Sequence, residues 1–547
     1  MNRWMSEKTL DPVLKEKLQN MSPEEQTEAF HGELAFGTGG MRGIVGPGTN
    51  RMNKYVLRRT NYGFANYLLA HYPHPVCVIA YDSRHYSKEF AMDSACVLAS
   101  LGVKTYVFRR ITPTPELSFA VRALKASGGI VITASHNPPQ YNGYKVYDEK
   151  GCQLVPGLVE SLSEFIAKAP DAFAINPLSW AALMQEKMIE WVSDTIDDAY
   201  LERVLRIPVH PHLSKKIKVI YTPLHGTGGY LATRILDATG YQYETVAKQM
   251  IPDPEFSTVK SPNPENVSAF TLAVEQSNHQ ADILVATDPD ADRIGIAVLD
   301  HGDYRFLTGN QTGALLIDYL CRYRYFDGVV FNTIVTSELG AQIARRHGLR
   351  VISTLTGFKY IGEQAGILEH LHERYFFGYE ESYGYLIEDF VRDKDSLQSM
   401  LLVLDMANFY HHQGKTLVER LDEIYQEYGY YLDHLVNIQL EGVEGSARIL
   451  RILDAFRTAT FPFEVVAFED YLNSVHVEGT KTTPITLPKE NVLKFFLKDG
   501  SWFVVRPSGT EPKMKLYFSI KSTSLQTAKL AKDELERVLL KMVESVL

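Results

Sequence analysis

The chain has 547 residues, 45% of them hydrophobic and 22% charged, a composition typical of a soluble globular protein with several domains. Its formal net charge of −10 lacks the basic excess of a nucleic-acid-binding protein, and no apolar run approaches the ~18 residues of a membrane span. The polar N-terminus has no signal-peptide core, and the four cysteines form no Cys-x-x-Cys pair. We therefore expect a cytoplasmic protein that binds neither nucleic acid nor membranes.

Most of the chain alternates between predicted strands and predicted helices, which is typical of α/β domains. The strand candidates are short and almost continuously apolar, so we expect them to be buried on both faces of mostly parallel sheets. Strands are predicted at 76–81, 103–108, 129–133, 216–222, 282–287 and 328–333, and helices at 87–101, 230–239 and 312–322.

The last quarter of the chain has a different pattern. Segments 492–497 and 502–506 predict a hairpin around Asp499-Gly500, followed by a strand at 515–520. A final helix is predicted from Leu525, with Ser524 as its N-cap. This pattern indicates a small α+β domain, and we place domain boundaries at 1–200, 201–308, 309–430 and 431–547.

The first candidate site is the segment 133–138, TASHNP, at the end of a predicted buried strand. Open α/β sheets bind ligands at the carboxyl ends of their strands, although a lone serine there is also common in an ordinary polar turn. The Gly-x-Ser-x-Gly elbow of serine hydrolases is absent. Ser135 is followed by Asn142-Gly143-Tyr144-Lys145, which we expect to place the Lys145 amine on a turn nearby.

The second candidate is the acidic segment 288–293, DPDADR. In an extended loop, alternate side chains face the same way, so we expect the three carboxylates to converge on a hard divalent cation, with Mg²⁺ favoured over zinc. An EF-hand is excluded because Arg293 and Leu299 stand where that loop requires Gly and Glu. Taken alone, the segment is also compatible with a solvated acidic turn.

Two further loops carry polar groups suited to a phosphosugar. Segment 506–513, RPSGTEPK, combines an arginine fork, hydroxyls and a glycine that lets backbone N–H groups approach an anion. Segment 378–384, GYEESYG, combines adjacent carboxylates with a hydroxyl after an aromatic strand. Each loop taken singly is also explained as a plain turn.

Taken in chain order, these segments and 36–43, FGTGGMRG, resemble the motifs of the α-D-phosphohexomutase superfamily, most closely its phosphoglucomutase/phosphopentomutase branch. The resemblance covers nearly the whole chain. It implies three similar α/β domains with mixed, mostly parallel sheets, plus a smaller C-terminal α+β domain, around a central cleft. Pro289 and Ala291 replace the glycine spacers usual in the metal loop, and Tyr379 precedes Glu380 where the family usually has Gly, which leaves sugar selectivity open.

The resemblance also implies roles for individual residues. Ser135 would carry the phosphoryl group and supply one metal ligand. The three aspartates of segment 288–293 would also bind the Mg²⁺ ion. Arg42, Lys145 and Arg293 would line the reacting centre, with Lys145 as the first choice of general base because we expect nearby cations to favour its neutral form. His136 and Lys394 would be further candidates for proton transfer or charge stabilisation. The metal ligands would be Asp288, Asp290 and Asp292, and the substrate-binding residues Arg293, Gly357, Glu380, Ser382, Arg506, Ser508, Gly509 and Thr510.

The expected activity is that of a phosphoglucomutase, which interconverts glucose 1-phosphate and glucose 6-phosphate through a phosphoserine and a sugar bisphosphate, with glucose 1,6-bisphosphate as activator. Phosphopentomutase, phosphomannomutase and sugar-bisphosphate synthase activities are alternatives within the enzyme class. A phosphosugar-binding protein without catalysis is the alternative from another class. The oligomeric state, monomer or dimer, stays open.

Overall fold

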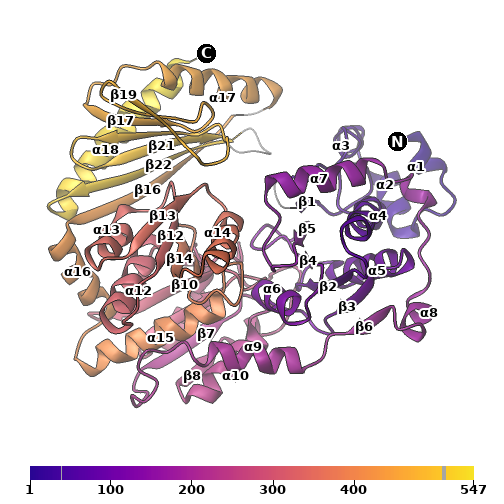
Figure 1. Cartoon of the computed structure of the whole chain (residues 1–547), viewed down its shortest axis with the longest axis horizontal. Coiled ribbons are helices and arrows are strands. Elements are labelled where there is room, and N and C mark those ends of the chain that lie inside the picture. The colour runs from indigo at the N-terminus through magenta and orange to yellow at the C-terminus, as the bar shows by residue number, and fades with distance from the viewer. Residues whose placement is uncertain (38–39, 441, 508–512, 547) are drawn as a thin grey trace. The chain divides into compact units, whose positions relative to one another are not determined.

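The computed structural model describes residues 1–37, 40–440, 442–507 and 513–546, in two compact units (Figure 1). One unit comprises Met1–Gly309 and Phe358–Thr416, and the other comprises Asn310–Gly357 and Leu417–Leu547. The boundaries expected near 200, 308 and 430 stay predictions. Within the described ranges, no helix combines the length and apolar character needed to cross a membrane.

The first sheet of unit 1 has six strands, in the order β1-β5-β4-β2-β3-β6. The inner strands β2, β3 and β4 and the edge strand β6 are parallel, whereas β5 runs antiparallel to both β4 and β1. The strands span Gly40–Ile44 (β1), Val76–Tyr81 (β2), Lys104–Val107 (β3), Gly128–Ile132 (β4), Tyr141–Tyr147 (β5) and Ile189–Trp191 (β6).

Helices cover both faces of this sheet, which explains the continuous apolar character of its strands. Helices α4 (Lys54–His71), α5 (Ser87–Ser100) and α7 (Pro156–Ala167) share one core with alternate strand residues such as Ile79. Helix α6 (Thr114–Ala123) packs on β2 and β4 and lies so close to Gly129 that a Cβ there would be 2.7 Å from Val121. The strands predicted at 76–81, 103–108 and 129–133 and the helix at 87–101 are therefore confirmed.

The turn predicted for residues 142–145 is wrong, because these residues lie within strand β5. Asn-Gly is a common turn pair, but here both residues fit between two neighbouring strands. The Asn142 amide donates to Ser87 Oγ (2.9 Å) and His85 O (2.9 Å), and a Cβ on Gly143 would be 2.4 Å from Thr133 O. The close approach of β4 therefore requires glycine at this position.

The second sheet of unit 1 has the order β11-β10-β9-β7-β8. Strand β7 is parallel to β8 and β9, while β10 is antiparallel to β9 and β11. Strand β9 is fully buried and ends directly before Asp288. The strands span Lys218–Thr222 (β7), Gln242–Thr245 (β8), Ile283–Thr287 (β9), Ile294–Asp300 (β10) and Asp303–Leu307 (β11), and helix α10 spans Gly229–Thr239.

The rest of unit 1 consists of shorter elements. The later segment contains α14 (Phe358–Leu371), the antiparallel pair β14 (Tyr375–Glu380) and β15 (Gly384–Leu386), and the buried helix α15 (Ser396–His412). The remaining helices are α1 (Asn2–Ser6), α2 (Pro12–Asn20), α3 (Pro23–Ala29), α8 (Trp180–Gln185), α9 (Thr195–Val204) and α11 (Thr271–Ser277).

Unit 2 combines a parallel strand pair with the predicted C-terminal α+β domain. Strands β12 (Val329–Thr333) and β13 (Arg350–Thr354) are parallel and accompany α12 (Gly309–Tyr323), α13 (Glu338–Arg346) and α16 (Leu417–Tyr428). A seven-stranded sheet follows in the order β16-β22-β21-β20-β17-β18-β19. Its strands span Tyr430–Gln439 (β16), Val465–Asp470 (β17), Val475–Glu478 (β18), Lys481–Pro484 (β19), Leu493–Leu497 (β20), Trp502–Pro507 (β21) and Lys513–Ser522 (β22).

The C-terminal sheet is covered on one face by α17 (Gly442–Arg457) and α18 (Leu525–Ser545), which share a single hydrophobic core with alternate residues of β21 and β22. Strands β20 and β21 form the predicted hairpin. Ser524 caps α18, since its side chain accepts from Thr527 N. The expected strands and terminal helix of this region are confirmed.

Candidate active site

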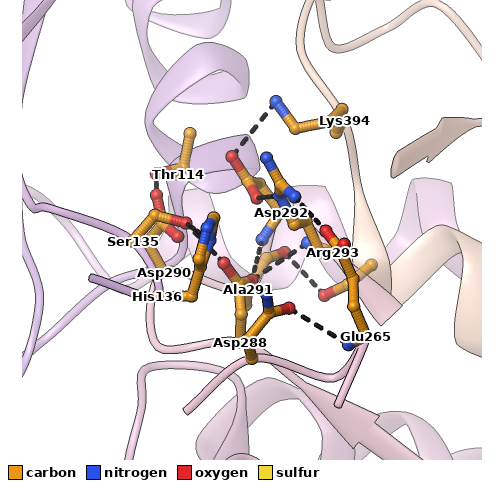
Figure 2. Close-up of polar contacts among 12 residues, drawn as sticks. Thr114, Ser135, His136, Glu265, Asp288, Asp290, Ala291, Asp292, Arg293 and Lys394 are labelled. Atoms are coloured by element: carbon orange, nitrogen blue, oxygen red, sulfur yellow. Dashed lines mark hydrogen bonds and ion pairs between the residues drawn. The ribbon is translucent and has the colours of Figure 1, made fainter. Parts of the chain in front are cut away.

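Ser135 lies in a tight loop directly after β4. The residue is buried, with 3% of its surface exposed, and its φ of 52° places it in the left-handed region, which L-residues rarely adopt. Its backbone N–H donates to Thr133 Oγ1 (2.8 Å). Its hydroxyl donates to Asp288 Oδ2 (2.6 Å), and the Oγ lies 3.1 Å from His136 Nδ1. Figure 2 shows Ser135 facing the acidic loop.

The three aspartates converge as predicted, with one oxygen of each within 4.8 Å of the others. The reason differs from the prediction, because the loop is a tight turn instead of an extended segment. Ala291 has a φ of 53°, and Asp288 Oδ1 accepts from Asp292 N (3.1 Å) and Arg293 N (3.0 Å). The turn folds the chain back around the first carboxylate.

The acidic cluster has the character of a cation site. All three aspartates are at most 2% exposed, and Asp290 Oδ1 and Asp292 Oδ1 are buried and accept no hydrogen bond from any described residue. Burial and the neighbouring Asp290 and Asp292 charges raise the pKa of Asp288 well above its ordinary value. Buried oxygens without partners are costly, and oxygen-only ligands suit Mg²⁺, so these residues fit the predicted metal.

Thr114, at the start of α6, is a further contact of the acidic loop that sequence reasoning missed. Its hydroxyl donates to Asp290 Oδ2 (2.9 Å) and its backbone N–H donates to Asp290 O (2.9 Å) (Figure 2). The contact joins residues 176 positions apart in the chain. The segment TPTPE offers only a helix start, so the sequence carries no signal for this contact.

The predicted basic residues of unit 1 surround this cluster. Lys394 Nζ lies 3.2 Å from Asp292 Oδ2, and Arg293 pairs with Glu265 at 2.5 Å, both visible in Figure 2. Arg42, from β1, donates to Asn137 Oδ1 (2.8 Å). Glu265 was missed because nothing in its sequence context distinguishes it from other surface carboxylates.

Lys145 does not have the surroundings that we expected. Its Nζ donates to Asp290 Oδ2 (2.8 Å) and Asp292 Oδ2 (3.4 Å). Burial opposes the charge on Lys145, but these two carboxylates raise the pKa of its amine above the ordinary value. The expectation that cations crowd Lys145 is wrong in this structure, since carboxylates are its closest partners. For His136, burial and the Arg293 and Arg42 guanidinium groups lower the pKa of the ring.

The predicted sugar loop connects β14 to β15 and is tied to the acidic loop. Glu380, the last residue of β14, is 6% exposed, and Ser382 lies half-buried in the following turn. Ile294 N donates to Tyr383 O (3.1 Å), and Gly384 forms a β-bridge with Arg293. The acidic loop and the sugar loop therefore hold one another in register.

Two of the predicted substrate-binding residues, Gly357 and Arg506, belong to unit 2. Arg506 lies in β21 and pairs with Glu490 Oε1 (3.0 Å), while Gly357 follows β13 with a φ of 113°. Ser508, Gly509 and Thr510 lie outside the described residues. The roles predicted for all of these residues stay predictions.

Comparison with known proteins identifies the family. The models of four phosphoglucomutase/phosphomannomutase domains match in succession: α/β/α domains I, II and III at residues 33–172, 198–302 and 308–428, and the C-terminal domain at 435–537. The chain belongs to the phosphoglucomutase/phosphomannomutase family. It is therefore a phosphosugar mutase with three α/β domains and a C-terminal domain, and the alternative of a binding protein without catalysis is set aside.

Curated relatives and solved structures agree with this family. A phosphoglucomutase of Staphylococcus epidermidis strain ATCC 12228 is 40% identical over 536 residues, covering 95% of this chain and 96% of the relative. A phosphoglucomutase of Staphylococcus aureus strain USA300 is 40% identical over 527 residues, covering 94% of each.

The fold is similar to that of parafusin, a phosphoglucomutase from Paramecium, with a TM-score of 0.72, 17% identity, and 95% of this chain and 96% of that chain covered. It is also similar to a phosphoglucomutase/phosphomannomutase family protein of Burkholderia thailandensis, with a TM-score of 0.70, 20% identity, and 94% and 98% covered.

Proposed function

We propose that this mutase is a phosphoglucomutase that interconverts glucose 1-phosphate and glucose 6-phosphate through phosphorylated Ser135. The observation that carries the proposal is the buried Ser135 hydroxyl, 2.6 Å from Asp288 in a cluster of three carboxylates. The name carried by relatives that are 40% identical over nearly the whole chain supports glucose as the sugar.

Each half-reaction transfers one phosphoryl group. In the first half-reaction, an oxygen of the sugar hydroxyl forms a bond to phosphorus while the bond from phosphorus to Ser135 Oγ breaks; the hydroxyl proton passes to a general base, and Ser135 Oγ takes up a proton from a general acid. The product is a sugar bisphosphate, which must turn end for end before its other phosphate returns to Ser135. Glucose 1,6-bisphosphate is thus both the intermediate and the activator that first loads the serine.

The residues around Ser135 divide the remaining tasks. Asp288, Asp290 and Asp292 would hold Mg²⁺, which neutralises charge on the transferring group. Arg42 and Arg293 stabilise negative charge at the reacting centre. Lys145, Lys394 and His136 are the candidates for proton transfer. Glu380 and Ser382 bind sugar hydroxyls, and the Arg506 loop binds the phosphate that does not react.

The test is intact-mass spectrometry combined with mutase assays. Wild-type protein incubated with glucose 1,6-bisphosphate gains one phosphoryl group, and Ser135→Ala gains none and loses steady-state turnover. Assays with glucose, mannose, glucosamine and ribose 1-phosphates rank the substrates, and we expect glucose to give the highest kcat/KM. Turnover by Ser135→Ala at the wild-type rate would remove this serine from the mechanism, and a higher kcat/KM for another sugar would reassign the substrate.

A further inference from the structure

A buried arginine outside the predicted site holds the backbone of the Ser135 loop. Arg84 lies in the turn between β2 and α5, and its side chain has no exposed surface. Its guanidinium donates four hydrogen bonds to main-chain oxygens, from Nη2 to Ser135 O (2.5 Å) and Asn137 O (2.5 Å) and from Nη1 to Pro138 O (2.9 Å) and Tyr141 O (3.1 Å). One side chain therefore fixes the loop between β4 and β5 at four points.

Arg84 is itself fixed by its neighbours. Its Nε lies 3.3 Å from Asp82 Oδ2, and both side chains are completely buried. Asp82 Oδ1 accepts from Arg84 N (3.0 Å) and Ser87 Oγ (2.7 Å), which fixes the carboxylate. The Arg84 guanidinium carbon lies 4.9 Å from the centre of the Phe256 ring, so an aromatic ring faces the fork. A planar guanidinium held in this way is pre-organised to bind several carbonyl groups at once.

The contacts explain how Ser135 keeps an unfavourable backbone conformation. The left-handed conformation is unfavourable for serine and persists only where its surroundings enforce it. Here the N–H of Ser135 is held by Thr133 Oγ1 and its carbonyl by Arg84. With both neighbouring peptide groups fixed, Oγ is directed at Asp288 Oδ2.

We propose that Arg84 is a positioning residue for phosphoryl transfer, which fixes the direction of Ser135 Oγ through the loop backbone without touching the substrate. This inference rests on the proposed function of Ser135. The positioning role depends on the hydrogen bonds of the guanidinium as well as on its positive charge. A lysine ammonium at this position has the charge but cannot reproduce the planar fork that donates to four carbonyl groups. Arginine is therefore required here even though the charge is buried away from solvent.

The experiment compares Arg84→Lys and Arg84→Met with the wild type. We expect kcat to fall roughly 100-fold in both variants, as it does when a reacting group is displaced by about 1 Å, with KM for glucose 1-phosphate within about threefold of the wild type because the substrate contacts remain. Phosphorylation of Ser135 by glucose 1,6-bisphosphate, followed by intact mass, slows in parallel with kcat. The kcat and phosphorylation rate of each variant are calculated per folded molecule, and circular dichroism measures the folded fraction.

A second buried arginine provides the matched control. Arg420 of α16 pairs with Asp318 at 2.9 Å and belongs to unit 2. Arg420→Met loses a buried ion pair as Arg84→Met does, and we expect it to lower the thermal midpoint without lowering kcat. An equal fall of kcat in the control variant would reduce Arg84 to a structural role and overturn the proposal.

The outcomes separate this inference from the proposed function. If wild-type protein never gains a phosphoryl group on Ser135, both fall together. If the wild type is phosphorylated and Arg84→Lys keeps the wild-type kcat and phosphorylation rate, only the role of Arg84 is overturned. Should the Arg84 variants not fold, Phe256→Leu leaves every hydrogen bond of the fork but removes the ring beside it. We then expect kcat to fall about tenfold at constant KM, and an unchanged kcat would overturn the proposal.

Discussion

At the scale of single residues, the acidic loop brings three buried carboxylates within 4.8 Å of one another. Such an arrangement destabilises the folded protein unless positive charge compensates it. Lys145 and Lys394 supply part of that positive charge through ion pairs with Asp290 and Asp292. Arg293 Nε lies 3.8 Å from Asp292 Oδ1, but Asp290 Oδ1 and Asp292 Oδ1 accept no hydrogen bond from the described residues, which leaves both oxygens able to bind a cation.

Removal of the metal should therefore stop the reaction. We expect chelation with EDTA to abolish mutase activity and Mg²⁺ to restore it. Asp290→Asn removes one of the three charges and should weaken Mg²⁺ binding by roughly tenfold or more, measured by isothermal titration calorimetry. Glu275→Gln, an exposed carboxylate of α11, serves as the control. Full activity of the metal-free enzyme would show that the acidic loop is only a structural turn.

Thr114 gives a second prediction at this scale. Thr114→Val keeps the shape of the side chain but removes the hydroxyl that donates to Asp290 Oδ2, so the carboxylate loses one constraint. We expect the affinity for Mg²⁺ to fall severalfold. The free energy of unfolding, measured with urea, should fall by about 1–2 kcal/mol. In the control Thr239→Val, a hydroxyl that only bonds its own helix backbone is lost. Equal Mg²⁺ affinity in all three proteins would contradict a role of Thr114 at the site.

At the scale of secondary-structure elements, strand β5 connects the serine loop to the metal site. It pairs with β4 on one side and β1 on the other, and it carries Lys145 to the aspartates. Arg42 is on β1, opposite Gly143. The antiparallel strand β5 and the edge strand β1 beside it thus bring Lys145 and Arg42 to the loop that carries Ser135.

Gly143 tests whether this strand must lie so close to β4. A Cβ there would be 2.4 Å from Thr133 O, so Gly143→Ala should destabilise unit 1 by about 2–3 kcal/mol and lower kcat by displacing Lys145. The matched control is Gly157→Ala in α7, where a Cβ meets no atom within 4 Å and should stabilise the helix by about 0.5–1 kcal/mol. Urea unfolding followed by circular dichroism compares the two. Equal urea midpoints for the two variants would show that residue 143 does not lie too close to Thr133 O for a Cβ.

At the scale of the whole molecule, the predicted site residues are distributed over two compact units. Ser135, the three aspartates, Lys145 and Lys394 belong to unit 1, whereas Gly357 and the Arg506 loop belong to unit 2. The roles predicted for Gly357 and Arg506 in binding the phosphate stay predictions.

Arg506 provides the corresponding prediction. Arg506→Ala removes the guanidinium expected to bind the phosphate that does not react, so KM for glucose 1-phosphate should rise roughly tenfold or more. Loss of glucose 1,6-bisphosphate to solution should increase, while loading of Ser135 at saturating bisphosphate persists. The control is Arg457→Ala, since Arg457 pairs with Asp470 in the same unit. An unchanged KM in Arg506→Ala would remove this residue from the substrate site.

Most strands and helices, and the segments that carry the candidate site, could be predicted from local sequence patterns. Apolar runs predicted strands such as β2, β4 and β9 because burial on both faces of a sheet requires continuous apolar residues. The serine and aspartate motifs were visible because each is a short contiguous segment whose polar residues follow such a strand. Asp288, Asp290 and Asp292 converge as their spacing predicted, but they do so through a tight turn held by Asp288 Oδ1 and not through the alternation of an extended loop.

The groups from distant parts of the chain that contact these motifs could not be predicted from local patterns. Ser135 and Asp288 are 153 positions apart, and Thr114 and Arg84 reach the site from a helix start and a turn that resemble many others. The pair Asn142-Gly143 predicted a turn because local preference favours one, yet the space between β1 and β4 makes it a strand. The surroundings of Lys145 likewise depend on carboxylates from another domain. Sequence spacing determines local geometry, whereas the packing of sheets and loops decides which charges meet, because contacts between distant segments leave no periodic pattern in the chain.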